Sequence, residues 1–192
     1  GGIYMKKAHE VDFKVYGDDM QFVEILLDQN ETIIAEAGSM MFMDQSIKLE
    51  TIFGDGSGSD AGKGLMGKVL GAGKRVLTGE SLFMTSFTNT AAERKSVAFA
   101  APYPGKIIPL DLSEYNGELI CQKDAFLCAA KGIQVEIAFQ KKVGAGLFGG
   151  EGFIMQKLIG DGLSFLHAGG TIIQKELAPG EVLKLDTGCL VA

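Results

Sequence analysis

The sequence is poor in cysteine and histidine, and each shortage excludes a class of site. Its three cysteines cannot all pair, and Cys121, Cys128 and Cys189 lie among apolar neighbours. We therefore expect buried, reduced thiols and a reducing compartment, not a disulfide framework. The two histidines, His9 and His167, have no cysteine or carboxylate at ligand spacing, which argues against a metal site or a histidine-based triad.

Positive charge and long apolar runs are also lacking. The formal net charge is −6 over 192 residues, whereas binding nucleic acid by broad phosphate neutralisation requires a positive surface. No run of 18 apolar residues occurs, and the charged start, residues 1–7, is followed by no apolar signal core. The sequence predicts a cytoplasmic protein without a transmembrane segment, for which nucleic acid is an unlikely partner. Its length suits one compact domain, 1–192.

Alternation of apolar and polar residues predicts β-strands along most of the chain. Apolar side chains occupy every second position in residues 11–15, 47–50 and 135–140, the pattern of a half-buried strand. Clusters of Asp, Asn, Pro and Gly separate such runs at 28–30, 102–105, 115–117 and 178–180. Many short strands joined by such turns are typical of antiparallel sandwiches and barrels, so we predict an all-β fold.

An internal repeat supports a division into β units. Residues 31–42 (ETIIAEAGSMMF) align without gaps on residues 181–192 (EVLKLDTGCLVA), and residues 125–136 (AFLCAAKGIQVE) form a weaker copy. The matching glycines, Gly38, Gly132 and Gly188, lie where a second strand must bend. We predict three antiparallel β-sandwich units, 8–52, 81–143 and 144–192, with a glycine-rich basic arm at 53–80. Because the chain stops inside an apolar run, we expect a longer native protein or a last strand at a sheet edge.

Two glycine-rich segments resemble phosphate-binding loops but lack the required context. Gly144, Gly146 and Gly149 form G-x-G-x-x-G after the strand-like run 135–139. A dinucleotide site needs a helix at the third glycine, but more glycines prolong the loop and no helix of crossover length fits. We interpret 144–165 as a connector between β units. The segment 54–64 is not a Walker A loop, because glycine follows its lysine, so we expect no cofactor.

The basic arm is the main candidate for a contact surface. Between residues 61 and 79 no acidic residue occurs, and a helical projection places the apolar side chains opposite the basic ones, Lys63, Lys68, Lys74 and Arg75. Each of its glycines would cost a helix about 1 kcal/mol relative to alanine, so a short helical arm would be stable only when docked. The arm could dock against the sheet, a neighbouring subunit, an anionic ligand or partner, or a membrane surface.

Candidate catalytic groups are few. Asp186-Thr187-Gly188 imitates the aspartic-protease signature, but a working site needs two such aspartates, and the first copy has Glu36-Ala37-Gly38 in its place. Paired carboxylates could also come from Glu36 with Asp186, or from Glu151 with Asp161. The sequence combines none of these groups into a recognisable catalytic motif, so we predict a protein without catalytic residues, metal or cofactor.

Several motifs together resemble a known family. Residues 144–165, Gly169 to Glu181 (GGTIIQKELAPGE), Asp186-Thr187-Gly188 and Gly79 to Phe83 (GESLF) closely resemble the signature of the mitochondrial-biogenesis (altered inheritance of mitochondria) family, formerly a bacterial domain of unknown function. The resemblance covers about 11–192. It implies a fold like that of the tryptophan RNA-binding attenuation protein, with three fused β-sandwich units, and assembly into oligomers. It implies neither RNA binding nor catalytic residues, and family members usually continue past the position of Ala192.

These observations favour a non-enzymatic, homo-oligomeric scaffold or interaction protein. Its likeliest contact residues are Lys63, Lys68, Lys74 and Arg75, facing a protein partner or an anionic surface. The alternative is a binding module for an anionic ligand, a lipid headgroup or RNA through the same four residues.

Overall fold

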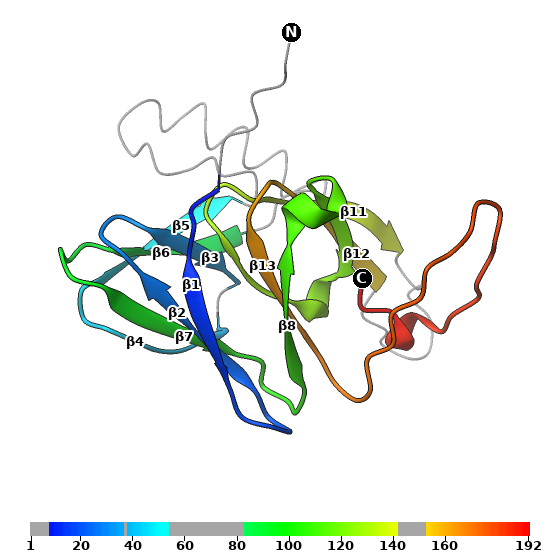
Figure 1. Cartoon of the computed structure of the whole chain (residues 1–192), viewed down its shortest axis with the longest axis horizontal. Coiled ribbons are helices and arrows are strands. Elements are labelled where there is room, and N and C mark those ends of the chain that lie inside the picture. Colours follow the sequence, from blue (N-terminus) through cyan, green and yellow to red (C-terminus); the bar gives the residue numbers. More distant parts are fainter. Residues whose placement is uncertain (1–7, 37, 54–82, 142–152) are drawn as a thin grey trace, which may run out of the picture.

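A computed structural model describes residues 8–36, 38–53, 83–141 and 153–192 of the chain (Figure 1). The strands in these ranges are β1 Asp12–Tyr16, β2 Phe22–Leu27, β3 Thr32–Ala35, β4 Met40–Met43, β5 Ile47–Phe53, β6 Phe83–Asn89, β7 Lys95–Ala100, β8 Lys106–Asp111, β9 Glu118–Gln122, β10 Phe126–Ala130, β11 Gln134–Lys141, β12 Phe153–Ile159 and β13 Leu163–Ala168. The same ranges contain short 3-10 helices: η1 Leu112–Tyr115 between β8 and β9, η2 Lys123–Ala125 between β9 and β10, and η3 Thr187–Cys189 after β13. The predicted all-β class is confirmed, and the described ranges contain no α-helix.

The burial of each strand follows from its sequence. In β2 the apolar Val23, Ile25 and Leu27 are buried while the residues between them are partly exposed, as the alternation predicts for one solvated face. The strands β3 (TIIA) and β10 (FLCAA) have no such alternation and are buried on both faces. The predicted turn clusters lie between strands or in the C-terminal segment, as expected.

The strands form three sheets. Their orders are β1-β2-β7-β4, β5-β6-β3-β10-β13-β8 and β11-β12-β9, with every pairing between named strands antiparallel. One apolar cluster spans all three sheets. Phe13 of the first sheet meets Phe165 of the second edge-on, with ring centroids 4.9 Å apart, and Leu158 brings the third sheet into the same cluster. Burial of this shared core is the main force holding the sheets together.

The strand pairing recurs along the chain. Pairs β2–β7, β3–β6, β4–β7 and β5–β6 reappear as β8–β13, β9–β12, β10–β13 and β11–β12. The register irregularity recurs as well: it lies between Met40 and Phe42 in β4, and between Phe126 and Cys128 in β10. The pairing β3–β10 then joins the two sets in the six-stranded sheet. The six consecutive strands from β2 to β7 therefore match the six from β8 to β13, and we call these the two matching sets.

This pairing corrects the register of the sequence repeat. Because β9 takes the place of β3, Glu118 corresponds to Glu31, and each follows a residue with positive φ, Gly117 (76°) and Asn30 (66°). The second copy therefore begins at Glu118 and not at residue 125, and the match of Gly132 with Gly38 is wrong. The division into three units, 8–52, 81–143 and 144–192, stays a prediction.

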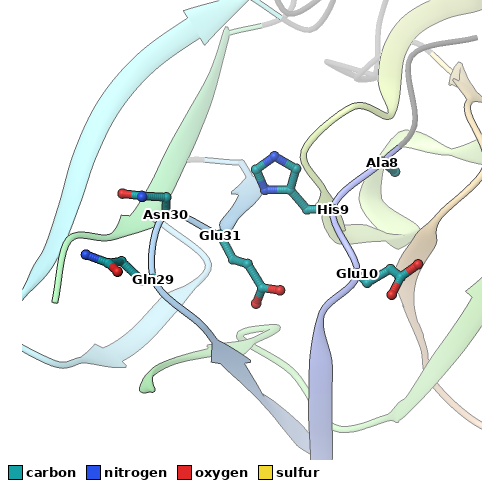
Figure 2. Close-up of a pocket in the computed structure, with 6 residues that line it drawn as sticks. All are labelled: Ala8, His9, Glu10, Gln29, Asn30 and Glu31. Atoms are coloured by element: carbon teal, nitrogen blue, oxygen red, sulfur yellow. The ribbon is translucent and has the colours of Figure 1, made fainter. Parts of the chain in front are cut away.

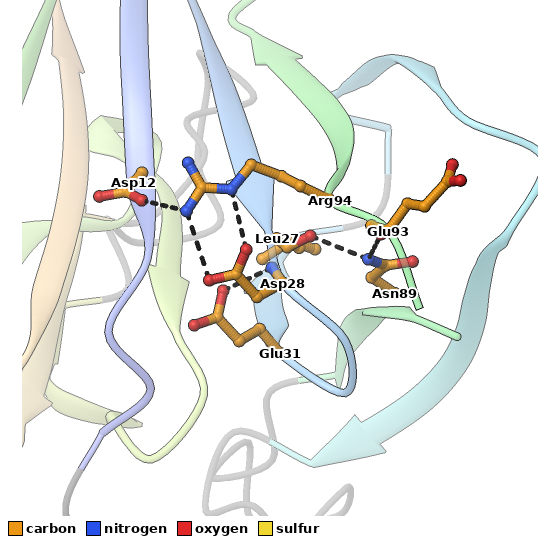
Figure 3. Close-up of polar contacts among 7 residues, drawn as sticks. All are labelled: Asp12, Leu27, Asp28, Glu31, Asn89, Glu93 and Arg94. Atoms are coloured by element: carbon orange, nitrogen blue, oxygen red, sulfur yellow. Dashed lines mark hydrogen bonds and ion pairs between the residues drawn. The ribbon is translucent and has the colours of Figure 1, made fainter. Parts of the chain in front are cut away.

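A buried asparagine fixes the end of β6. Asn89 has no exposed surface, and its Nδ2 donates hydrogen bonds to the carbonyl oxygens of Leu27 and Glu93, each at 2.8 Å. Its Oδ1 accepts from the Ala91 amide at 2.9 Å. Figure 3 shows this amide beside the ion pairs of Arg94. Because each polar atom of the side chain has a partner, Asn89 can lock three chain segments together inside the core.

Candidate functional site

Several predicted site residues lie outside the described ranges. These are the basic residues Lys63, Lys68, Lys74 and Arg75, the glycine motif from Gly144 to Gly149, and Glu151. The candidate site is therefore built from the remaining groups.

The predicted carboxylates serve local structure. Asp186 Oδ1 accepts from the Gly188 amide at 2.9 Å and caps η3, and Asp161 Oδ1 accepts from the Ala8 amide at 2.7 Å. Glu36 follows β3 and accepts from Nε2 of Gln156 on β12 at 3.3 Å. Glu36 and Asp186 have different hydrogen-bond partners, so no described hydrogen bond brings this predicted pair together. The pair of Glu151 with Asp161 stays a prediction, because Glu151 lies outside the described residues. Across the described ranges, His, Cys, Asp and Glu form no group of three or more that could hold a metal ion.

Glu36 lies in the most unusual electrostatic environment of the three. Burial raises the pKa of its carboxyl, and Asp124 adds to that rise, while the Gln156 hydrogen bond and Lys123 act against it. Gln156 is fully buried, and its Oε1 has no hydrogen-bond partner. The contact joins the end of β3 to β12 across two sheets. The carboxyl of Glu36 therefore holds its proton more tightly than an exposed carboxyl does.

The thiols and imidazoles are also accounted for. Burial raises the pKa of Cys121 to about 12 and raises that of Cys128, so neither thiol is a nucleophile at neutral pH. Cys189 is exposed, which corrects the expectation that all three thiols are buried; it is the last residue of η3, in which no residue is buried. His9 Nδ1 accepts from the Thr32 amide at 3.0 Å. His167 is buried against Tyr103, and burial lowers its pKa.

An open hollow of about 380 Å³ lies between the start of the described chain and the turn after β2. Figure 2 shows its lining, Ala8, His9, Glu10, Gln29, Asn30 and Glu31. Two of its polar groups are engaged in the fold: His9 with Thr32, and Glu31, whose Oε2 accepts from the Asp28 amide at 2.7 Å. In Figure 2 the carboxylates of Glu10 and Glu31 do not point toward one another. The hollow therefore shows no convergent chemistry.

The largest unexplained feature is the segment after β13. Residues 169–186, here called the C-terminal arm, extend away from the sheets and form no strand (Figure 1). Its exposed apolar side chains are Ile172, Ile173, Leu177, Val182, Leu183 and Leu185, with Val182 82% and Ile173 76% exposed. Such a concentration of large apolar side chains on one segment is typical of an interaction surface.

The arm has an ordered turn that matches one in the body. The Glu181 amide donates to the Ala178 carbonyl at 2.9 Å, and Glu181 Oε2 accepts from the Ala178 amide at 3.0 Å. Glu31 makes both bonds with Asp28, at 3.0 and 2.7 Å. The turn between β2 and β3 thus recurs inside the arm, as the alignment of 31–42 with 181–192 indicates.

A second exposed apolar surface lies on β4. Of the described strands it pairs only with β7, at the edge of its sheet, and Met41 and Phe42 are 55% and 44% exposed. Open edge strands offer unpaired backbone groups to another strand. Sequence reasoning missed this surface, because an apolar run without alternation (MMFM) is equally consistent with a buried strand.

None of the helices in the described residues could cross a membrane, being too short and insufficiently apolar.

The chain is similar to a protein from Streptococcus pyogenes of known crystal structure, with a TM-score of 0.60 and 22% identity, over 84% of this chain and 66% of that chain. It thus spans just under two thirds of that protein, and at this identity the likeness shows the fold alone. No curated protein matched the chain. The model of one family, described as "Mitochondrial biogenesis AIM24", matches residues 13–192, nearly the whole chain. The chain belongs to the AIM24 mitochondrial biogenesis family.

Proposed function

We propose that the protein is a non-enzymatic, homo-oligomeric scaffold or interaction module. The observation that carries this proposal is the exposed apolar surface of the C-terminal arm, with Val182 and Ile173 more than three quarters exposed. Leaving such side chains in water is unfavourable by about 25 cal/mol per Å² of apolar surface, so their contact with another chain would be stabilising. The dispersed roles of Glu36, Asp161 and Asp186 support the non-enzymatic part.

The location belongs to the same proposal. Cys121 and Cys128 are buried as free thiols, and such thiols fit a reducing compartment. We therefore propose that the protein acts in the cytoplasm.

Self-association is tested by light scattering during size-exclusion chromatography, over a dilution series from about 100 to about 1 micromolar, a range in which specific oligomers persist. We expect a mass of at least two chains at the upper end. A single-chain mass of 20.4 kDa throughout would remove the homo-oligomeric part of the proposal.

The alternative is a module that binds phosphate-bearing anions through Lys63, Lys68, Lys74 and Arg75. It is supported by residues 61–79, which contain these cations and no acid in a chain of net charge −6. Changing all four to glutamine should abolish salt-sensitive binding to vesicles containing phosphatidylserine or to an unstructured RNA. The two probes distinguish a headgroup from a nucleic acid. Lys14→Gln with Lys48→Gln is the control, and binding unchanged by the fourfold variant would contradict this function.

A further inference from the structure

We propose that residues 182–185 of the C-terminal arm form an antiparallel strand with β4 of a second copy of this chain. This inference rests on the proposed self-association and names its interface. The inference follows from the pairing of β3 with β10, which joins the two matching sets. Part of the same pairing recurs between β9 and the last residues of the chain. Residues 182–185 and the outer edge of β4 are then left without partners among the described strands.

The first junction is complete. Strand β3 pairs with β10, in the register Ala35↔Cys128, Ile34↔Ala129 and Ile33↔Ala130. Both strands are fully buried, because each also has a partner on its other edge. The junction therefore joins β3 of the first matching set to β10, the counterpart of β4, in the second.

The second junction begins in the same register. Strand β9 is the counterpart of β3, and Gln122 at its end donates its amide hydrogen to the Val191 carbonyl at 2.8 Å. When Glu31, Glu118 and Glu181 are aligned, Gln122 takes the place of Ala35, and Val191 takes the place of Cys128. The contact Gln122–Val191 thus repeats the pairing Ala35↔Cys128. Residues 190–192 lie where a counterpart of β4 belongs.

Two edges remain without partners under this alignment. Residues 182–185 are the counterpart of β3, yet they form no strand, and Val182, Leu183 and Leu185 are exposed, whereas every residue of β3 is buried. Strand β4 is the counterpart of β10, yet its outer edge pairs with no described strand. Among the described residues, the arm has no β4-type partner and β4 has no β3-type partner, so each edge has the form that the other requires.

The internal junction fixes the register of the proposed contact. The register irregularities of β4 and β10 make Phe42 the counterpart of Cys128. Ala35↔Cys128 then corresponds to Leu185↔Phe42, and Ile34↔Ala129 corresponds to Lys184↔Met43. The exposed Leu185 and Phe42 would become directly opposed neighbours. Apolar pairs of this kind stabilise antiparallel strands by about 0.2–1 kcal/mol each, beyond the backbone hydrogen bonds gained.

The geometry favours a contact between copies over closure within one. Figure 1 is drawn with the longest axis horizontal, and β4 and the arm lie at opposite ends of it. One copy can therefore offer its arm to the β4 edge of the next, in a head-to-tail contact. Contacts of this type build rings when the rotation closes and open chains when it does not.

The test uses thiol cross-linking of the whole chain in a Cys189→Ser background, because Cys189 is exposed whereas Cys121 and Cys128 are buried. Two tagged proteins of different size, one with Leu185→Cys and one with Phe42→Cys, are mixed and treated with a short bis-maleimide. We expect a mixed cross-linked dimer at least about tenfold faster than with Leu49→Cys in place of Phe42→Cys, since opposed residues lie within about 5.5 Å. Leu49 is exposed on β5, also an edge strand.

A second variant tests the same contact without a reagent. Leu185→Asp should weaken self-association at least about tenfold, because a carboxylate would be buried against Phe42 without a partner. Leu49→Asp is the matched control and should leave the association constant unchanged. Both leucines are exposed in the single chain, so neither change should prevent folding.

The outcomes separate this inference from the function on which it rests. Oligomers by light scattering, with equal cross-linking at Phe42 and Leu49, would overturn the proposed interface and leave the scaffold function standing. A single-chain mass at every concentration would overturn both. A chain carrying both Phe42→Cys and Leu185→Cys that cross-links only within itself would show that the arm closes on its own β4, which also overturns the contact between copies.

Discussion

Replacing Asn89 with aspartate is expected to cost roughly 3 kcal/mol of unfolding free energy at neutral pH. The shape of the side chain is kept, but the amide that donates to the Leu27 and Glu93 carbonyls becomes a carboxylate oxygen facing both. The new charge would have no exposed surface, and only the bond from the Ala91 amide would survive. Urea denaturation followed by circular dichroism measures the loss.

The loss should depend on pH in a defined direction. Burial beside two carbonyl oxygens raises the pKa of the new carboxyl in the folded state above its value of about 3.9 in the unfolded chain. The folded state therefore binds the proton more tightly, so the free energy of unfolding falls as pH rises above about 4, and the decrease is complete above the folded-state pKa. We expect Asn89→Asp to be closer to the parent protein at pH 4 than at pH 7.

A matched control is available at Asn116. This residue is exposed with φ 58°, a conformation that aspartate also tolerates, so Asn116→Asp should change stability by less than about 0.5 kcal/mol at either pH. A loss at Asn89 that is equal at pH 4 and pH 7 would contradict the role assigned to the amide hydrogens and would point to altered packing instead.

Sequence reasoning succeeded where local chemistry decides structure. Alternation at 47–50 and 135–140 placed β5 and β11, and the turn residues placed the bends, because strand faces and positive-φ turns depend on neighbouring residues. It could not place β4 at an open edge, because the four residues MMFM carry no sign of which edge has a partner. That property depends on β7, more than 50 residues further along the chain.

The repeat shows why a glycine match misled the alignment. Gly38 and Gly132 both have positive φ, but Gly132 turns between β10 and β11 while Gly38 turns between β3 and β4. The position equivalent to Gly38 in the second set is Ala125 in η2, where no positive φ is needed. The better signal was a residue able to adopt positive φ followed by glutamate, as in Asn30-Glu31, Gly117-Glu118 and Gly180-Glu181.

Replacing Gly105 with alanine is expected to cost roughly 3 kcal/mol. Gly105 is buried at the start of β8, where its backbone bonds to both Asp19 and Gln21. An added Cβ would lie 2.5 Å from the Ala168 carbonyl oxygen and 2.5 Å from Cε1 of His167. The backbone of β13 cannot retreat without disturbing its pairing with β8, so the strain has no inexpensive release. Thermal and urea unfolding measure the loss.

Two further variants identify which contact causes the strain. Gly169→Ala adds a methyl group at the same end of the β8–β13 pair but next to the other strand, with its nearest neighbour at 3.4 Å, so its effect should stay below about 0.5 kcal/mol. Adding His167→Ala to Gly105→Ala removes the ring but leaves the Ala168 carbonyl in place. If the carbonyl dominates, the double variant will be no more stable than Gly105→Ala, since the loss of buried His167 then adds to the strain. A double variant more stable than Gly105→Ala would instead assign the strain to the imidazole. A Gly105→Ala protein as stable as Gly169→Ala would contradict the close approach of Gly105 to the end of β13.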